Sequence, residues 1–431
     1  MISETMISMG TASECYIYIT LPGETTFVTA GKFELTTDRQ GIPAGRFIYG
    51  RKYLARENAV AIDPLELKLN NKTYETNKLK GIFGSLRDAS PDYWGRRVIE
   101  KLIGQTQLGE IDYLLHSPDD RAGALGFGLE KEPPAPCRKF NQTIELERLQ
   151  ALADLIIADE ELPDGAEAEQ TQNLMGGGTS MGGARPKVVV EDKDGLWIAK
   201  FHHPEDKWND ARVEHAMLML ARECGLQTSD SKVITIGKHD ALLVKRFDRE
   251  QTKAGYRRGR MLSALTLLRA DDDYQDRGKW SYVLLVEELR RISSQPRTDA
   301  VELFLRMCFN ALISNIDDHP RNHAVIAMDT EWKLSPAYDL TPSTPISIEH
   351  RDLALECGDM GRYAHAENLL SQSARFLLEP DVAQNMIDEM EKTVTNKWYE
   401  VARRAGVTEK DCEKISSAFA YPGFRLKLPT Q

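Results

Sequence analysis

The stretch "SNIDDHPRNHAVI", residues 314–326, places two Asp, two His and two Asn in one short polar loop. It follows the mostly apolar run "VELFLRMCFNALI" at 301–313 and leads into an apolar segment that is typical of a strand. Such a loop has three readings. The loop could supply metal ligands, act as a catalytic loop for phosphoryl transfer, or form only a well-capped turn.

The metal reading would give a metallohydrolase. His319 and His323 are four residues apart, a spacing that puts two imidazoles on one face of a helix, and Asp317 and Asp318 add oxygen ligands. Pro320 lies between the histidines and disfavours the helix that this spacing needs.

The phosphoryl-transfer reading finds its parts in chain order. Asp317 and Asn322 match the D-x-x-x-x-N spacing of a proton-accepting Asp and a Mg²⁺-binding Asn. Two short strands, "HAVIAM" and "EWKLSPAY", follow and lead to Asp339, the second Asp of the pattern, which is expected to bind the metal. Upstream, the strand "LWIAKF" presents Lys200 for the phosphates, and Glu214 in the next helix is expected to pair with it.

Two further segments extend this reading. "LLVKRFDR" at 242–249 fits a linker whose backbone, around Lys245 to Phe247, contacts adenine. A Gly-rich segment at 174–187 matches no standard phosphate motif, but its glycines let backbone N–H groups approach phosphate oxygens, and Arg185 and Lys187 add positive charge. A flexible surface loop is the alternative for this segment.

Composition limits the class of protein. At 431 residues the chain is expected to form two or three packed units, and its net charge of −11 makes it a poor nucleic-acid binder by itself. The basic cluster "KAGYRRGR" at 253–260 is expected to be a solvated loop. Six scattered cysteines, no apparent signal peptide and no apolar span predict free thiols, a cytoplasmic location and no membrane association.

Local patterns predict the secondary structure. Residues 15–70 are β-rich, beginning with a hairpin around Pro22 and Gly23, and a helix is expected from Pro91 to about Ile103. "VVV" and "LWIAKF" form a second hairpin, and "DARVEHAMLMLARECGL" forms an amphipathic helix that ends at Gly225. The rest of the chain shows mainly helical periodicity.

With "DASPDYWGRR", "SMGGARPK", "VKRFDR", "NIDDHPRN" and "LSPAYDL" in place, the chain resembles the HipA-family serine/threonine kinases over nearly its whole length. These are the toxins of type II toxin–antitoxin pairs. The resemblance implies an α+β, two-lobed protein-kinase-like fold with a β-rich N-terminal lobe and a helical C-terminal lobe. The expected parts are a β-rich subdomain at 1–135, the rest of the N-lobe at 136–248 and the helical lobe at 249–431.

The resemblance also implies roles for residues. Asp317 would be the catalytic base, Asn322 and Asp339 would hold Mg²⁺, and Ser180 would be the site of inhibitory self-phosphorylation. ATP would be contacted by Gly182, Gly183, Ala184, Arg185, Pro186, Lys187, Lys200, Lys245, Arg246, Phe247, His319, Pro320, Arg321, Asn322, Tyr338 and Asp339.

The implied partners are a HipB-like helix-turn-helix antitoxin, operator DNA reached mainly through that antitoxin, and a protein substrate such as an aminoacyl-tRNA synthetase or another translation component. A catalytically silent kinase fold that acts as a scaffold and co-repressor is the main alternative.

Overall fold

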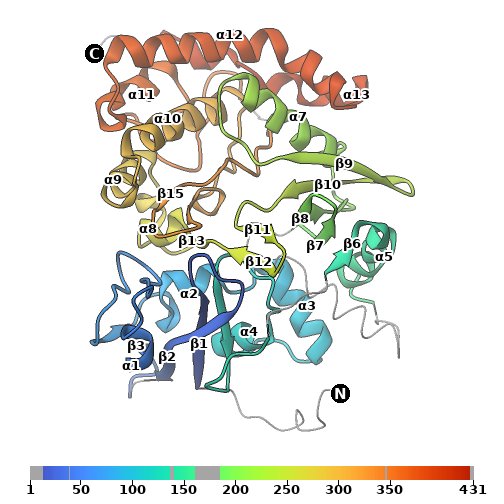
Figure 1. Cartoon of the computed structure of the whole chain (residues 1–431). Helices are drawn as coiled ribbons and strands as arrows, with labels where there is room; N and C mark the ends of the chain where they lie inside the picture. Colours follow the sequence, from blue (N-terminus) through green and yellow to red (C-terminus); the bar gives the residue numbers. More distant parts are fainter. Residues whose placement is uncertain (1–12, 38, 136–139, 161–184, 345–346, 428–431) are drawn as a thin grey trace. The chain divides into compact units, whose positions relative to one another are not determined.

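The computed structural model describes residues 13–37, 39–135, 140–160, 185–344 and 347–427 (Figure 1). The chain divides into two units. The first unit comprises 1–196, 248–262 and 327–330, and the second comprises 197–247, 263–326 and 331–431. One boundary between the units therefore falls inside a strand, at residues 196 and 197.

The first unit is built on an antiparallel sheet with the strand order β4-β3-β2-β1-β5. Its strands and those that follow in this unit are β1 (Glu14–Thr20), β2 (Phe27–Thr37), β3 (Pro43–Tyr49), β4 (Thr73–Thr76), β5 (Leu125–Gly128), β6 (Asn141–Gln142), β7 (Lys187–Asp192), β11 (Arg249–Thr252) and β12 (Gly255–Arg258). Its α-helices are α1 (Arg51–Leu54), α2 (Gly84–Asp88), α3 (Tyr93–Ile103), α4 (Glu110–His116) and α5 (Leu146–Ile157).

Alternating side chains of this sheet form one face of the core. Ile17, Ile19, Phe33 and Phe47 are fully buried in a single apolar cluster with residues of α2 and α4. Gly31 permits the close approach of β2 and β3, because a Cβ atom there would lie 2.3 Å from the carbonyl oxygen of the facing strand. The predicted β-rich start of the chain is confirmed, and so is the helix after Pro91.

The second unit combines a small sheet with a helical region. Its strands are β8 (Gly195–Lys200), β9 (Ser231–Ile236), β10 (His239–Lys245), β14 (Ala324–Ala327) and β15 (Lys333–Leu334). Strands β8 and β14 cross a boundary with the first unit, and β13 (Arg260–Ser263) belongs to the second unit only through Ser263. The α-helices of the second unit are α7 (Asp210–Glu223), α8 (Ala264–Leu267), α9 (Tyr282–Ile292), α10 (Pro296–Leu312), α11 (Ala366–Ser371), α12 (Pro380–Arg404) and α13 (Glu409–Ile415).

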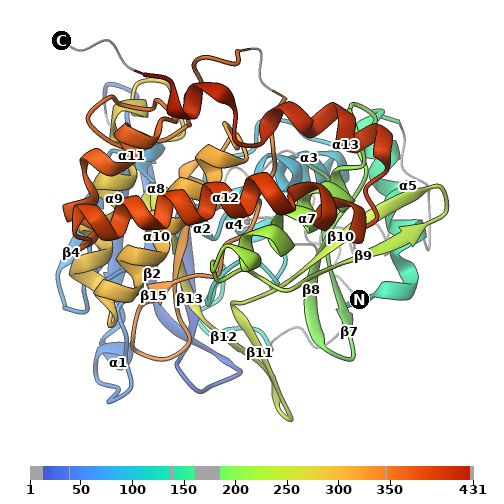
Figure 2. The same cartoon turned by 90° about the horizontal axis from the view of Figure 1, so that it is seen from above.

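Helix α10 is the centre of the helical region. Leu303, Phe304, Met307 and Phe309 are fully buried on it, and α9 and α12 both pack against it. Figure 2 shows α12 running across α10 and α7. Strand β10 pairs with β8 and β9, and α7 packs on β9 and β10. The predicted mixed α+β class, with a helical C-terminal region, is confirmed.

One prediction of local structure was wrong. The basic cluster at 253–260 is not a solvated loop, because β11 and β12 form an antiparallel hairpin that contains most of it. Arg258 is buried and donates to the Asp119 carboxylate at 2.9 Å, and Arg257 pairs with Glu250 at 3.1 Å. One cross-strand ion pair, Arg257 with Glu250, and one pair with an acid outside the hairpin, Arg258 with Asp119, neutralise two of the charges that suggested a solvated loop.

The predictions on cysteines and membrane spans can be compared directly with the structure. Cys15, Cys224, Cys308, Cys357 and Cys412 are free thiols. Within the described ranges, no helix has both the length and the hydrophobicity needed to cross a bilayer. The predicted part boundaries at 135 and 248 remain a prediction.

Candidate nucleotide and metal site

Three predicted residues of the second unit meet in one ion cluster. Lys200, the last residue of β8, donates from Nζ to both carboxylate oxygens of Glu214 on α7, at 2.7 and 3.0 Å. The same Nζ donates to Oδ1 of Asp339 at 2.6 Å. The predicted pairing of Lys200 with Glu214 is therefore present, and it also includes an acid 139 residues farther along the chain.

The two carboxylates of this cluster stabilise the charged form of Lys200. Burial alone would lower the pKa of Lys200, but the carboxylates of Asp339 and Glu214 outweigh it and raise the pKa above its usual value. Lys200 is therefore a fixed cation at neutral pH. A fixed ammonium next to an acid is the arrangement that a nucleotide phosphate and its metal require.

Asp339 has an unusual backbone. Its φ is +58°, in the left-handed region, which Asp tolerates better than most residues. It follows Tyr338, whose hydroxyl donates to the carbonyl oxygen of Arg321 at 2.7 Å. This bond ties the Asp339 segment to the polar loop that contains Asp317 and Asn322.

The polar loop begins where α10 ends and finishes in a short 3₁₀ turn, Pro320–Asn322, before β14. His319 caps this turn, because its Nδ1 accepts a hydrogen bond from the backbone N–H of Arg321 at 3.1 Å. The amide nitrogen of Asn322 donates to the backbone carbonyl of Asp317 at 3.3 Å. The amide oxygen of Asn322 is then the atom that could ligate a cation.

Asp317 lies at the surface of the loop. Partial desolvation, followed by the negative charge of Asp339, raises the pKa of its carboxyl above the usual value. Its interaction with Asp339 connects the predicted base to the Lys200 cluster, and a raised pKa suits a carboxylate that accepts a proton.

Asn322 and Asp339 offer an amide oxygen and a carboxylate. Oxygen ligands of this kind fit Mg²⁺, which usually keeps several waters and takes one or two carboxylates together with substrate phosphates. The chemistry of the two side chains is thus compatible with the predicted metal.

The three residues of the predicted adenine-binding linker differ in their contacts and burial. The rings of Phe247 and Tyr338 are 5.6 Å apart, so Phe247 lies beside the Asp339 segment. The backbone N–H of Lys245 donates to the carbonyl of Asp230 at 2.7 Å and is engaged in the sheet. The side chain of Arg246 is buried. The N–H of Lys245 is therefore engaged within the protein, and the contact of this linker with adenine remains a prediction.

His319 and Arg321 have a partner that sequence reasoning did not identify. Asp272 lies 2.7 Å from Nε2 of His319 and accepts a hydrogen bond from Nε of Arg321 at 3.0 Å. The pKa of Asp272 is far below its usual range because of His319. Asp272 lies in the acidic segment at 271–273, where no spacing rule links it to the loop.

Part of the predicted phosphate segment is described. Arg185 is half-buried and Pro186 is buried, while Gly182, Gly183, Ala184 and Ser180 lie outside the described residues. Lys187 is 2 % exposed, and its Nζ lies 2.5 Å from the carboxylate of Asp92. Trp94 donates to the carbonyl of Lys187 at 3.2 Å. This buried ion pair within the first unit disfavours a direct contact of the Lys187 ammonium with phosphate.

The four residues of the metallohydrolase reading are divided between different contacts. His323 and Asp318 are buried against each other, with Nε2 and Oδ2 2.8 Å apart, whereas His319 faces Asp272 and Asp317 lies at the surface. In the part of the chain that the structure describes, no group of three or more His, Cys, Asp or Glu side chains is placed to hold a metal.

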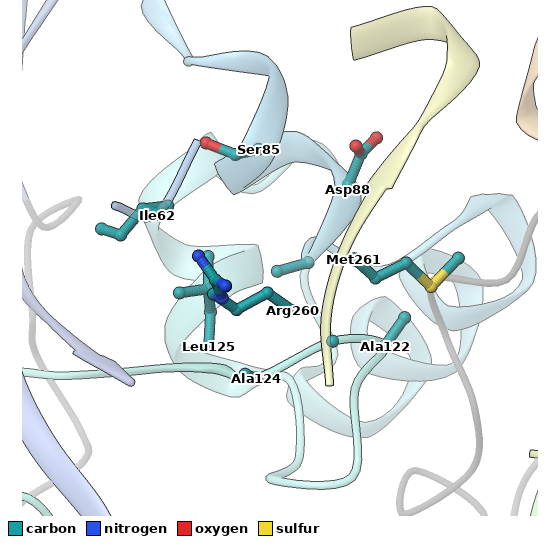
Figure 3. Close-up of a pocket in the computed structure, with 10 residues that line it drawn as sticks. Ile62, Ser85, Asp88, Ala122, Ala124, Leu125, Arg260 and Met261 are labelled. Carbon is teal, nitrogen blue, oxygen red and sulfur yellow. The ribbon is translucent and has the colours of Figure 1, made fainter. Parts of the chain in front are cut away.

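A small cavity lies in the first unit (Figure 3). Ile62, Ser85, Asp88 and Arg260 are among its lining residues. The guanidinium of Arg260 donates to the carbonyls of Ala61 and Asp329 at 2.9 and 2.8 Å, and burial lowers its pKa to about 10. Its donors therefore tie backbone segments together, and none of the predicted site residues lines this cavity.

Comparison with known proteins identifies the family. The family model for the HipA-like C-terminal domain matches residues 179–398. A protein of Sinorhizobium fredii (strain NBRC 101917 / NGR234), named "Putative kinase Y4mE", is 25% identical over 335 residues, which cover 71% of this chain and 74% of that protein.

Among solved structures, HipA of Shewanella oneidensis MR-1, in a complex with HipB and its operator DNA, has a TM-score of 0.67 and 16% sequence identity. The match covers 93% of this chain and 94% of that one, and it shows a shared fold. Because the family model spans half of the chain and includes Lys200, Glu214, Asp317, Asn322 and Asp339, this protein belongs to the HipA-like family.

Proposed function

We propose that this chain is a protein serine/threonine kinase that transfers the γ-phosphoryl group of Mg-ATP to a protein hydroxyl. The contact of the Lys200 ammonium with both Glu214 and Asp339 carries this proposal. It joins the expected phosphate-binding lysine, its helix partner and the expected metal-binding acid in one cluster.

In this proposal each residue has a separate task. Lys200, held by Glu214, binds the α- and β-phosphates, and Asp317 orients the acceptor hydroxyl and takes its proton. The hydroxyl oxygen forms a bond to the γ-phosphorus while the bond from that phosphorus to the β–γ bridging oxygen breaks, and ADP leaves. Asn322 and Asp339 would hold Mg²⁺, which when bound neutralises charge on the phosphates.

The first test is ATP-dependent phosphorylation by the purified chain, followed by phosphoproteomics after brief induction in cells. Asp317→Asn should lower the transfer rate about 10²–10⁴-fold if proton transfer and orientation both matter. Transfer by Asp317→Asn at the wild-type rate would contradict the role assigned to Asp317. Absence of transfer by the wild type would favour a catalytically silent scaffold.

Self-phosphorylation at Ser180 belongs to the same proposal. A phosphoserine adds close to two negative charges, which oppose the simultaneous binding of ATP phosphates. Peptide mapping by mass spectrometry after incubation with Mg-ATP should find phosphate on Ser180 of the wild type and none on the Asp317→Asn variant. Phosphate confined to other residues would contradict this part.

The proposed partner is a HipB-like helix-turn-helix antitoxin that provides the contact with operator DNA. The relative from Shewanella oneidensis was solved with HipB and operator DNA, and a net charge of −11 opposes direct binding to phosphates by this chain alone. In a mobility-shift assay we expect retardation of operator DNA by the pair of proteins and none by this chain alone. Salt-sensitive binding by the chain alone would contradict this assignment.

A further inference from the structure

A buried polar cluster lies beneath the 314–326 loop, and the proposed mechanism does not use it. Oδ2 of Asp318 accepts a hydrogen bond from the Tyr282 hydroxyl and lies 2.8 Å from Nε2 of His323. Asn310 of α10 donates to the Tyr282 oxygen at 3.0 Å. Tyr282 begins α9, so the cluster joins the loop to both helices.

The cluster is almost completely shielded from water. Asp318 is 1 % exposed and His323 2 %, and Tyr282 and Asn310 are fully buried. The rings of Tyr282 and His323 pack edge to face, with centroids 5.4 Å apart. Nε2 of His323 faces the carboxylate of Asp318, an arrangement that favours the tautomer with the proton on Nε2.

The position of this contact in the chain suggests its role. Asp318 directly follows Asp317, and His323 directly follows Asn322. The side-chain contact between Asp318 and His323 therefore closes the base of the loop, and it links the neighbours of the proposed proton acceptor and metal ligand. We infer that Asp318, His323 and Tyr282 form a clasp that sets the separation of Asp317 and Asn322; this inference rests on the proposed kinase function.

The clasp differs from ordinary core packing because burying its polar atoms costs free energy. Oδ1 of Asp318 and Nδ1 of His323 are buried and have no hydrogen-bond partner in the described part of the chain. Buried polar atoms without partners cost about 1–3 kcal/mol each. An apolar core of similar volume would avoid this cost, so stability alone does not account for a charged residue here. A requirement for a fixed loop geometry does account for the presence of a charged residue in this buried cluster.

The clasp residues act as positioning residues, because their described contacts are with one another and with the supporting helices. Replacing a partner that orients a metal ligand typically costs 10–100-fold in activity or metal affinity. We therefore expect Asp318→Asn and His323→Gln each to lower kcat about 10–100-fold, with little change in KM for the acceptor. The Mg²⁺ concentration at half-maximal nucleotide binding should rise by a similar factor.

Two measurements would distinguish a positioning role of the clasp from a purely structural one. The Asp318→Asn/His323→Gln double variant should be no slower than the slower single variant, within about threefold, because both substitutions remove one contact. Tyr282→Phe removes the hydroxyl and leaves the contact of Asp318 with His323, so it should have a smaller effect than either single variant.

Asp240→Asn is a matched control in the same unit. Asp240 is a mostly buried acid that accepts from Arg212 at 2.6 Å and from Asn209 at 2.7 Å. It belongs to β10 and has no assigned part in binding or transfer. Its replacement should lower the melting temperature and leave kcat and the Mg²⁺ requirement unchanged.

Hydrogen exchange provides a test that needs neither nucleotide nor turnover. Backbone amides of residues 316–323 should exchange faster in Asp318→Asn and in His323→Gln than in the wild type, and at the wild-type rate in Asp240→Asn. Unchanged exchange in both clasp variants would overturn the inference. So would a loss of kcat that merely follows the loss of melting temperature across all four single variants. Absence of phosphoryl transfer by a wild type whose exchange pattern is as expected would refute the kinase function and not the clasp.

Discussion

Replacing Lys200 by Met would remove the cation from the centre of the ion cluster. Glu214, whose side chain is 6 % exposed, and Asp339 would then face each other without the Lys200 ammonium between them. Breaking a buried ion pair costs about 3–5 kcal/mol, and the partial exposure of Asp339 favours the lower limit. We expect a loss of about 3 kcal/mol in the free energy of unfolding at pH 8.

This loss should depend on pH in a definite direction. The pKa of Lys200 is raised in the folded state, so its stabilising effect is fully present below the unfolded value and declines only at strongly alkaline pH. In Lys200→Met, the carboxyls of Glu214 and Asp339, which have lost the Lys200 ammonium, take up protons as the pH falls. The difference between variant and wild type should therefore shrink between pH 8 and pH 5.

Lys397→Met is the matched control for this experiment. Lys397 also pairs with a glutamate of α7, Glu223, at 2.9 Å, but half of its side chain is exposed. Exposed pairs contribute about 0–1 kcal/mol. Urea denaturation followed by circular dichroism should therefore show a much smaller change for Lys397→Met than for Lys200→Met.

The same two variants test nucleotide binding. A hydrogen bond to a charged group contributes about 1.5–3 kcal/mol, so Lys200→Met should weaken Mg-ATP binding about 10–100-fold. Calorimetric titration should show wild-type affinity for Lys397→Met. Equal stability and equal affinity of the two variants would refute the role that we assign to Lys200.

Other predictions concern single acids and a second buried lysine. Burial raises the pKa of Asp63 to about 6, so the folded state loses about 3 kcal/mol as the pH rises from 4 to above 6; Asp63→Asn should abolish this loss in denaturation curves, and an unchanged pH profile would contradict it. Lys187→Met leaves Asp92 buried without its lysine, and urea denaturation should show a loss of about 3–5 kcal/mol; a loss below 1 kcal/mol would contradict a structural ion pair. The raised pKa of Asp317 predicts that kcat/KM falls on acidification at a pH above the usual aspartate range; a flat profile down to pH 4 would contradict its role as base.

Much of the candidate site could be predicted because its parts lie at fixed distances along regular elements. The strand before Lys200, the helix around Glu214 and the paired strands before Asp339 are all present as expected. Hydrophobic periodicity determines such elements locally. Asp317 and Asn322 lie in the same short loop, so their spacing could be predicted without knowledge of contacts between distant segments.

Contacts between distant segments could not be predicted in the same way. Asp272 is far from His319 in the sequence, and the pairing of Lys187 with Asp92 joins residues 95 positions apart. The sequence offers Asp318 and His323 as metal ligands because it does not show which side chains of a loop point into the core. Burial against α9 and α10 decides this, and burial depends on tertiary packing.

A crystal structure with Mg²⁺ and a non-hydrolysable ATP analogue would test the central claim most directly. We predict the phosphates against the ammonium of Lys200, a metal ion bound by Asn322 and Asp339, and the carboxylate of Asp317 facing the γ-phosphate. A nucleotide bound elsewhere, or a metal ion that touches neither Asn322 nor Asp339, would contradict the account.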